Sequence, residues 1–478
     1  MTSRTNATTH DATGVAASTA APDVVTALLA AGLPADVVVT DPDRLETYRY
    51  DRAMFCPAGV PAVVVLARET AHVQAALRVA SALAIPVVPQ GARSGLSGAA
   101  NAIDGCIVVS TERMNRVLTV DAGNRLVVTQ PGVFNADLSR AVAEHGLFYP
   151  PDPSSWEFCS IGGNLSTNSG GLCCVKYGVT GDYVLGLEVV LASGEVLRTG
   201  RRTVKGVAGY DLNRLFVGSE GTLGVITEAT LALRPASRQP HTMAALFNST
   251  QDAAAAVTAI IAAGHVPSLL ELMDRASVQA SAAYLRTDLP VECAAMLLAQ
   301  SDTGGDAGQA EVAAMAALAD AAGATDVIQA DDPAEADLLM AARRCVLLAF
   351  EAMGTTMIDD VCVPRTRLAE LMTGVERIAA ECGLVIGLLG HAGDGNMHPT
   401  VVFDGADPEQ ARLAEESFGA VMQLGLDLGG TITGEHGVGV LKREWLAREI
   451  GPVAVELHRS LKRAVDPAGI LNPGKVFI

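Results

Sequence analysis

The sequence predicts an α+β fold that is divided into two or three domains. Short β-branched runs such as 60–67 alternate with helical segments such as 70–84 along most of the chain. A chain of 478 residues is too long for one ordinary hydrophobic core. The segment from Pro235 to Pro240 separates two parts whose element patterns differ, and we expect the domain boundary there.

The composition is that of an acidic globular protein. Apolar residues make up 49% of the chain, aromatic residues make up only 4%, and the formal net charge is −19. This charge argues against nucleic acid or an anionic membrane surface as a general partner. An anionic substrate would therefore need a locally cationic pocket.

Cysteine usage and the N-terminal segment bear on the compartment. The nine cysteines include no CxxC motif, and their odd number favours a reducing, cytoplasmic setting. The same pattern argues against an iron–sulfur cluster held by a dense cysteine motif. The sequence has no run of about 18 apolar residues, so we expect no membrane span. Residues 1–21 lack the features of a secretion signal and are expected to form a disordered tail.

The first part of the chain begins with helices and strands in alternation. Residues 22–31 are expected to form a helix that Gly32 and Pro34 end. Strand 60–67, helix 70–84 and strand 86–89 then suggest a parallel strand pair with a crossover helix. Further elements expected in this part are strands at 106–110, 125–130 and 224–233, a helix at 135–145, and a strand–turn–strand unit over 183–198.

A glycine-rich loop, PQGARSGLSGAAN, follows the strand at 86–89. Such a loop exposes consecutive backbone N–H groups and can bind a pyrophosphate. The loop matches neither GxxxxGK[ST] nor GxGxxG, which argues against a P-loop or a Rossmann motif. The alternative is an ordinary surface loop.

Residues 150–171 form a second stretch without helical or strand periodicity. Irregular segments of this length inside a domain are usually functional. Gly162, Gly163 and Asn164 could bring backbone donors against a flat cofactor.

The second part continues the alternation of strands and helices. A helix over 332–350 carries Arg343 and Arg344. The other elements expected here are strands at 241–247, 269–273 and 294–300, helices at 251–263, 310–322, 367–382 and 408–428, and one or two helices over 443–465.

Two histidines flank a turn signal in LVIGLLGHAGDGNMHPTVVF. Asp394-Gly395 is typical of a two-residue type I′ hairpin turn, which would place His391 directly opposite His398. Paired residues project from one face about 4.5–5.5 Å apart, so the two imidazoles could share one metal ion. Glu435, in TGEHGVG, is a third candidate ligand and is followed at once by His436. The alternative is that each histidine is an isolated polar residue near a turn.

Seven segments in this order resemble a known family. They are PQGARSGLSG, PDPSSWEFCSIGGNLSTNSGG, KYGVTGDYVLGLEVVL, RTVKGVAGYDLNRLFVGSEGTLGVIT, GHAGDGNMH, TGEHGVG and ILNPGKV. The sequence is similar to FAD-linked D-2-hydroxyacid dehydrogenases of the vanillyl-alcohol-oxidase superfamily. These include the glycolate oxidase FAD subunit, D-lactate dehydrogenase and D-2-hydroxyglutarate dehydrogenase. The resemblance runs from about Ala53 to the C-terminus.

The resemblance implies a domain organisation. Residues 22–236 would form a PCMH-type FAD-binding domain of two subdomains, and residues 237–470 an α+β substrate-binding cap. Residues 471–478 would return to the FAD domain.

The resemblance also implies noncovalent FAD, because the first loop lacks the histidine that attaches the flavin in some relatives. The implied FAD-contacting residues are Gln90, Gly91, Ala92, Arg93, Ser94, Gly95, Leu96, Ser97, Pro151, Ser154, Ser155, Gly162, Gly163, Asn164, Ser166, Thr167, Glu220, Gly221, Gly224, Ile226 and Asn472.

The resemblance also implies metal-binding and catalytic roles for particular residues. The resemblance implies that His391, His398 and Glu435 bind a divalent metal, with zinc favoured although geometry alone permits manganese or iron. His436 would be the base. Arg343 would bind the substrate carboxylate, and Arg344 is the competing choice because the tryptophan of the family's segment is missing here.

The substrate expected from the resemblance is a small D-2-hydroxyacid. No second carboxylate clamp is evident in residues 358–364, which favours glycolate or D-lactate over a 2-hydroxydicarboxylate such as 2-hydroxyglutarate. The rival interpretations are a metallohydrolase without flavin and a nonenzymatic nucleotide-binding subunit. The electron acceptor is not specified, and a separate iron–sulfur or electron-transfer protein is one candidate. A homodimer is kept as an option.

Overall fold

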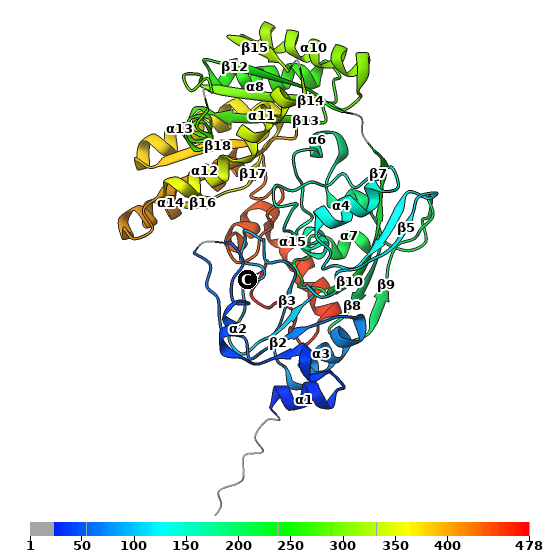
Figure 1. Cartoon of the computed structure of the whole chain (residues 1–478). Helices are drawn as coiled ribbons and strands as arrows, with labels where there is room; N and C mark the ends of the chain where they lie inside the picture. Colours follow the sequence, from blue (N-terminus) through cyan, green and yellow to red (C-terminus); the bar gives the residue numbers. More distant parts are fainter. Residues whose placement is uncertain (1–22, 54, 237–238, 288, 331, 478) are drawn as a thin grey trace, which may run out of the picture.

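The computed structural model describes residues 23–53, 55–236, 239–287, 289–330 and 332–477. The tail expected over residues 1–21 lies outside this part of the chain. Two lobes face each other, and the C-terminal segment, red in Figure 1, lies beside the N-terminal lobe. In the described ranges, no helix combines the length and apolar character that a membrane crossing requires.

The N-terminal lobe begins with a four-stranded sheet in the order β1-β2-β4-β3. Strand β4 lies between β2 and β3 and pairs in parallel with both. The predicted parallel arrangement is therefore present, but β2 and β3 are not neighbours, because β4 supplies the central strand. The bounds are α1 (Val24–Ala30), β1 (Val38–Val39), α2 (Pro42–Glu46), β2 (Val63–Leu66), α3 (Thr70–Leu83), β3 (Val87–Gln90) and β4 (Ile107–Ser110).

A five-stranded antiparallel sheet in the order β5-β6-β10-β8-β9 completes this lobe. Its apolar residues pack with Leu138 and Val142 of α4 and with Leu165. The bounds are β5 (Val117–Asp121), β6 (Leu126–Thr129), α4 (Asn135–Ala143), β7 (Leu147–Phe148), β8 (Val184–Val190), β9 (Val196–Arg198), α7 (Asn213–Phe216), β10 (Val225–Ala232) and β11 (Arg234–Pro235), where β7 pairs with β11.

The stretch predicted as irregular over 150–171 contains a short helix, α5 (Ile161–Thr167). Ser160 caps it, since its side-chain oxygen accepts a hydrogen bond from Gly163 N. A serine before a glycine pair carries little periodic signal, which explains why the sequence pattern missed this helix. A second short helix, α6 (Cys174–Tyr177), follows.

The second lobe is one antiparallel sheet in the order β15-β12-β14-β13-β18-β19-β16, with β17 paired to β19. Alternate strand residues enter two cores, as the two-residue period of a strand requires. One face packs against α8, α10, α13 and α14, and the other packs against α9, α11 and α12. The strands are β12 (His241–Phe247), β13 (Leu269–Asp274), β14 (Ala295–Ser301), β15 (Asp326–Gln329), β16 (Thr355–Ile358), β17 (Val361–Cys362), β18 (Val385–His391) and β19 (Asn396–Phe403).

The helix predicted over 332–350 is two helices that meet at Cys345. Cys345 has a φ of −86° and a ψ of −7°; it ends α11 and directly precedes α12. The helices of this lobe are α8 (Thr250–Ala262), α9 (Arg275–Leu285), α10 (Gly305–Ala321), α11 (Pro333–Arg344), α12 (Val346–Met353), α13 (Leu368–Cys382) and α14 (Pro408–Asp427).

The C-terminal segment runs back along the first lobe. Helix α15 (Arg443–Val465) is kinked at Gly451, whose φ of 76° is not helical, so it consists of two pieces. Leu471 then forms a parallel bridge with Val87 beside β3. Contact with the first lobe already begins at Val438, whose N–H donates to Glu220. The domain limits expected from the resemblance remain a prediction.

Candidate active site

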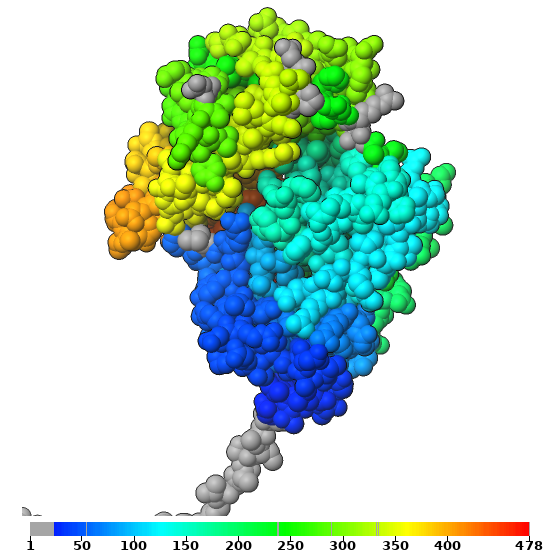
Figure 2. Space-filling view, in the orientation of Figure 1, coloured from blue at the N-terminus to red at the C-terminus, as the bar shows by residue number. Residues whose placement is uncertain are grey.

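A cavity of about 900 Å³ lies between the two lobes. Figure 2 shows the surface hollowed where they meet. The predicted site residues that line it are Gln90, Gly91, Ala92, Arg93, Ser94, Gly95, Leu96, Ser97, Ser154, Ser155, Gly162, Gly163, Asn164, Ser166, Thr167, Glu220, Gly221, Gly224, Ile226, Arg343, His398, Glu435 and His436. Pro151, Asn472 and His391 are not among the lining residues.

The glycine-rich loop after β3 offers a row of backbone donors to this cavity. Within the described part of the chain, the N–H groups of residues 93–97 have no hydrogen-bond acceptor. Gln90 holds the loop closed, because its side-chain amide donates to Tyr48 O and Ala100 O. Unpaired N–H groups on a cavity wall are available to a ligand, so this row fits the phosphate oxygens of a nucleotide cofactor.

Ser160 joins this loop to helix α5. Its hydroxyl oxygen accepts hydrogen bonds from Ala92 N and from Gly163 N. A Cβ on Gly91 would lie 2.3 Å from that oxygen, so only glycine permits the approach. A Cβ on Gly162 would lie 2.6 Å from Pro131 Cβ. The glycines predicted to admit a cofactor thus also allow the loop and helix to pack closely.

Glu220 contributes more than the predicted backbone contact. Its carboxylate oxygens accept hydrogen bonds from Val438 N and Gly439 N, both at 2.8 Å. Burial raises the pKa of this carboxyl to about 7. Glu220 therefore ties the wall of the cavity to the C-terminal segment.

Pro151 and Asn472 act behind the cavity wall. Pro151 O accepts a hydrogen bond from the Asn135 side chain. The Asn472 side-chain amide donates to Ala99 O and Glu220 O, so it links two cavity segments. The expected direct FAD contacts of these two residues remain predictions.

The histidines lie on a hairpin whose register differs from the prediction. His391 pairs with Asn396, and His398 pairs with Leu389. The turn spans residues 392–395, and both Asp394 N and Gly395 N donate to His391 O. The predicted two-residue turn and direct opposition are therefore wrong. Asp394 does not adopt the positive φ that a type I′ turn requires at both central residues.

The two imidazoles nevertheless meet on one face of the sheet. They are offset by two residues along the strands, and their ring centroids are 5.1 Å apart. Glu435 Oε1 lies 3.4 Å from His391 Nε2 and 3.3 Å from His398 Nε2. The other oxygen of Glu435 is buried and has no hydrogen-bond donor among the described residues. A cation would satisfy that oxygen, so this donor set fits a divalent metal.

Each of these histidines has a carboxylate at its other ring nitrogen. His391 Nδ1 is 2.7 Å from Glu271 Oε1, and His398 Nδ1 is 3.7 Å from Asp360 Oδ1. Glu271 accepts the Nδ1 proton of His391, which leaves Nε2 of that ring for a metal. Nδ1 of His398 and Oδ1 of Asp360 have no hydrogen-bond partner among the described residues. Neither Glu271 nor Asp360 was predicted as a site residue.

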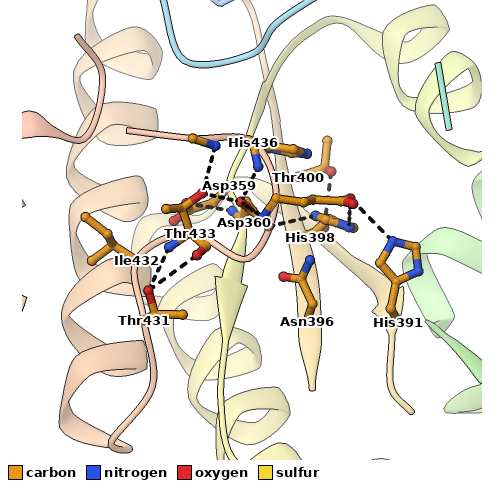
Figure 3. A network of polar contacts seen from close by, with 12 residues as sticks. Asp359, Asp360, His391, Asn396, His398, Thr400, Thr431, Ile432, Thr433 and His436 are labelled. Carbon is orange, nitrogen blue, oxygen red and sulfur yellow. Dashed lines mark hydrogen bonds and ion pairs between the residues drawn. The ribbon is translucent and has the colours of Figure 1, made fainter. Parts of the chain in front are cut away.

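Asp360 also shapes the loop that carries Glu435 and His436. Its Oδ2 accepts hydrogen bonds from Thr433 Oγ1, Glu435 N and His436 N. Figure 3 shows Asp360 beside Thr433 and His436. Burial would raise the pKa of Asp360, but His436, Lys442 and His398 lower it well below the usual value. Two adjacent acidic residues in the otherwise apolar IDDVCVP segment were the available signal.

Asp360, His398 and His436 form a second group with ligand atoms close enough for a metal. One oxygen of Asp360 accepts three hydrogen bonds, and the other, Oδ1, is buried without a hydrogen-bond donor among the described residues. The ring of His436 stacks on that of His398, with centroids 5.0 Å apart. Its Nδ1 is buried without a partner among the described residues. Burial lowers the pKa of His436 to about 4, so the ring is neutral and can accept a proton.

Arg343 lines the cavity but already has an ionic partner. Its Nε and Nη2 each lie 2.7 Å from Glu271 Oε2. Arg344, the competing choice, is exposed and also lines the cavity. A glutamate in the apolar strand sequence LLELMD was the signal for Glu271. Both arginines are thus within one cavity, with different environments.

Comparisons with known proteins agree with this geometry. Residues 237–476 match the family described as FAD linked oxidases, C-terminal domain, and residues 61–200 match the FAD binding domain family. The chain belongs to the FAD-linked oxidase family. The expected FAD cofactor is thereby confirmed.

Two curated relatives indicate the type of FAD-linked oxidase. The glycolate oxidase subunit GlcD of Bacillus subtilis is 41% identical over 87% of this chain and 89% of its own length. The D-lactate dehydrogenase of Anaerostipes hadrus is 36% identical over 93% of this chain and 95% of its own length. The protein is an oxidoreductase of the glycolate oxidase and D-lactate dehydrogenase type.

Solved structures confirm the PCMH-type fold. The structure of p-cresol methylhydroxylase with bound substrate superposes with a TM-score of 0.79 and 18% identity, over 95% of this chain and 96% of that chain. The 4-ethylphenol oxidase of Gulosibacter chungangensis gives a TM-score of 0.77 and 19% identity, with the same two coverages.

Substitution of Lys475 by methionine should weaken FAD binding about tenfold or more. The buried Lys475 ammonium donates to Gly98 O, Ala99 O and Asn101 O, which fixes the glycine-rich loop from behind. Titration of the apoprotein with FAD, followed by flavin fluorescence, measures the change. Lys205→Met, at an exposed lysine, is the control. An unchanged FAD affinity in Lys475→Met would contradict the role of this anchor.

Proposed function

We propose that this FAD-linked oxidase converts a small D-2-hydroxyacid, glycolate or D-lactate, to the 2-oxoacid. The observation that carries the proposal is that one cavity joins the donor-rich loop at 93–97 to His398, Glu435 and His436. The substrates in the names of the curated relatives support the choice of acid. A 2-hydroxyglutarate-type substrate is the second candidate.

The reaction removes a proton from the substrate hydroxyl and a hydride from C2. FAD, when bound, supplies the hydride acceptor at N5. His436 accepts the hydroxyl proton in this proposal, and its place on the cavity wall with an Nδ1 that lacks a partner among the described residues supports that role. The position of His436 against His398 keeps the base beside the proposed metal site.

His391, His398 and Glu435 are proposed to hold the divalent metal, with zinc favoured. A bound zinc ion would lower the pKa of a coordinated hydroxyl. The carboxylate of Glu271 orients the His391 imidazole for this purpose. The rival without flavin, a metallohydrolase, gives no role to the donor-rich loop.

Arg343 is proposed to bind the substrate carboxylate. Arg343 lines the cavity, and Glu271 occupies Nε and one N–H of Nη2, which leaves Nη1 and the second N–H of Nη2 for the substrate. Arg344 remains the competing choice.

Electrons are proposed to pass to a separate electron-transfer or iron–sulfur protein. The name of the Bacillus subtilis relative, a subunit, supports a partner. A cytoplasmic setting is part of the proposal and rests on the odd number of cysteines, nine, without a CxxC motif.

FAD should be bound noncovalently. The loop residues Arg93 to Ser97 include no histidine that could form a covalent link. Acid precipitation of the purified protein should therefore release all the flavin into the supernatant. Flavin that stays with the pellet after washing would show a covalent attachment and refute this part of the proposal.

The metal and base roles predict different losses. His391→Ala and Glu435→Ala should lose both metal and turnover yet keep FAD, because the FAD-binding loops lie in the other lobe. His436→Ala should keep metal and FAD while turnover falls about 10²–10⁴-fold, as is typical for loss of a general base. Metal analysis, flavin absorbance and turnover with an artificial acceptor measure the three properties.

Either of two results would overturn this assignment. The first is loss of metal in His436→Ala, which would make His436 a ligand. The second is active wild-type protein that contains no metal.

Arg343→Ala should raise KM for the hydroxyacid roughly tenfold or more, because a charge-assisted contact contributes on the order of 1.5–3 kcal/mol. Arg344→Ala is the matched variant from the next position. Steady-state kinetics of both, with thermal unfolding as a check on folding, decide between them. If Arg343→Ala is kinetically silent and Arg344→Ala is not, Arg344 binds the carboxylate.

A further inference from the structure

One buried carboxylate, that of Glu271, lies between a proposed metal ligand and the proposed substrate-binding arginine. Its Oε1 is 2.7 Å from His391 Nδ1. Its Oε2 is 2.7 Å from both Nε and Nη2 of Arg343. Glu271 is fully buried, and the Arg343 side chain is only 6% exposed. Neither partner can exchange this contact for water without rearrangement.

The sheet register brings these residues together. Glu271 lies on β13, which pairs with β18 so that Leu272 is opposite Gly390. Gly393 N donates to Leu270 O, which fixes the hairpin turn against the same strand. Glu271 therefore lies beside His391 although 120 residues separate them in the sequence.

The hydrogen bonds determine which nitrogen of His391 faces Glu271 with a proton. Both partners of Glu271 are donors, because a guanidinium has no acceptor. His391 must carry its proton on Nδ1 to donate to Oε1. Nε2 faces Glu435 Oε1 at 3.4 Å, and it is the nitrogen left to coordinate a metal when one is bound.

The His398 ring has no carboxylate hydrogen bond equivalent to the one between Glu271 and His391. Its Nδ1 lies 3.7 Å from Asp360, too far for a good hydrogen bond. The other oxygen of Asp360 is engaged by the loop at 433–436. The orientation of the metal-binding pair thus depends most strongly on Glu271.

We propose that Glu271 is a positioning residue that serves both halves of the site. It fixes the metal-binding tautomer of His391, and with its second oxygen it holds Arg343 at the cavity. This inference rests on the proposed metal site and deepens it. The same carboxylate would couple the metal ligand to the group that binds the substrate carboxylate.

Glu271→Gln tests the proposal, because it keeps the shape and removes one acceptor. An amide oxygen can face only one of the two donors, and the NH₂ group then faces the other. If the NH₂ group faces His391, the imidazole moves its proton to Nε2 and cannot bind a metal there. We expect Zn²⁺ affinity to fall on the order of 10–100-fold, the usual effect of losing such a partner. FAD content should stay at the wild-type level.

Zn²⁺ affinity is measured by competition with a chromophoric chelator on FAD-loaded protein. Asp274→Asn is the matched control, since Asp274 lies half-buried at the end of the same strand but caps α9 by accepting from Ser277 N. It should bind Zn²⁺ like wild type. Glu271→Asp keeps both acceptor oxygens on a side chain that is one methylene shorter, and it should restore part of the Zn²⁺ affinity. It also provides a second variant if Glu271→Gln does not fold.

The outcomes separate this inference from the proposed function. Wild-type Zn²⁺ affinity in both Glu271 variants, with loss of affinity in His391→Ala, would overturn the role of Glu271 and leave the metal site intact. Failure of the wild-type protein to bind Zn²⁺ would overturn both. Loss of affinity in Glu271→Gln but not in Asp274→Asn, with partial recovery in Glu271→Asp, is the result that we expect.

Discussion

The loop from Thr433 to Gly439 is held from both lobes by buried carboxylates, and the arrangement of the site depends on this. Asp360, from the second lobe, accepts hydrogen bonds from the N–H groups of Glu435 and His436. Glu220, from the N-terminal lobe, accepts hydrogen bonds from the N–H groups of Val438 and Gly439. A buried carboxylate that lacks donors is strongly unfavourable, so each acid orders the backbone that satisfies it. Glu435 and His436 are fixed at the boundary between the lobes as a result.

The same principle explains how an acidic protein can form a site for an acid. The chain has a formal net charge of −19, yet its buried acids near the cavity are paired or hydrogen-bonded. Glu271 is matched by Arg343 and His391, and Asp359 by the buried Lys442 at 3.0 Å. These pairs offset part of the negative charge beside the cavity.

Much of the site could be predicted from the sequence, because its residues occur in short motifs. The loop at 90–97, the histidines and Glu435 were all predicted, and the structure brings most of them to one cavity. The hairpin register was wrong, since Asp394-Gly395 satisfies a turn pattern that local hydrogen bonds to His391 O override. Glu271 was missed because its function arises from a contact across 120 residues. Strand patterns report burial, but they do not report which distant donor satisfies a buried acid.

The claim that one cavity joins flavin chemistry to hydroxyacid recognition can be tested in a single experiment. The purified FAD-loaded protein is mixed with glycolate or D-lactate without oxygen, and the visible absorbance of the flavin is followed in a stopped-flow instrument. The account predicts that one of these acids bleaches the flavin in the wild-type protein, and that His436→Ala with bound FAD and metal bleaches far more slowly. Flavin that stays oxidised with both acids in the wild-type protein, or equal bleaching rates in the two proteins, would contradict it.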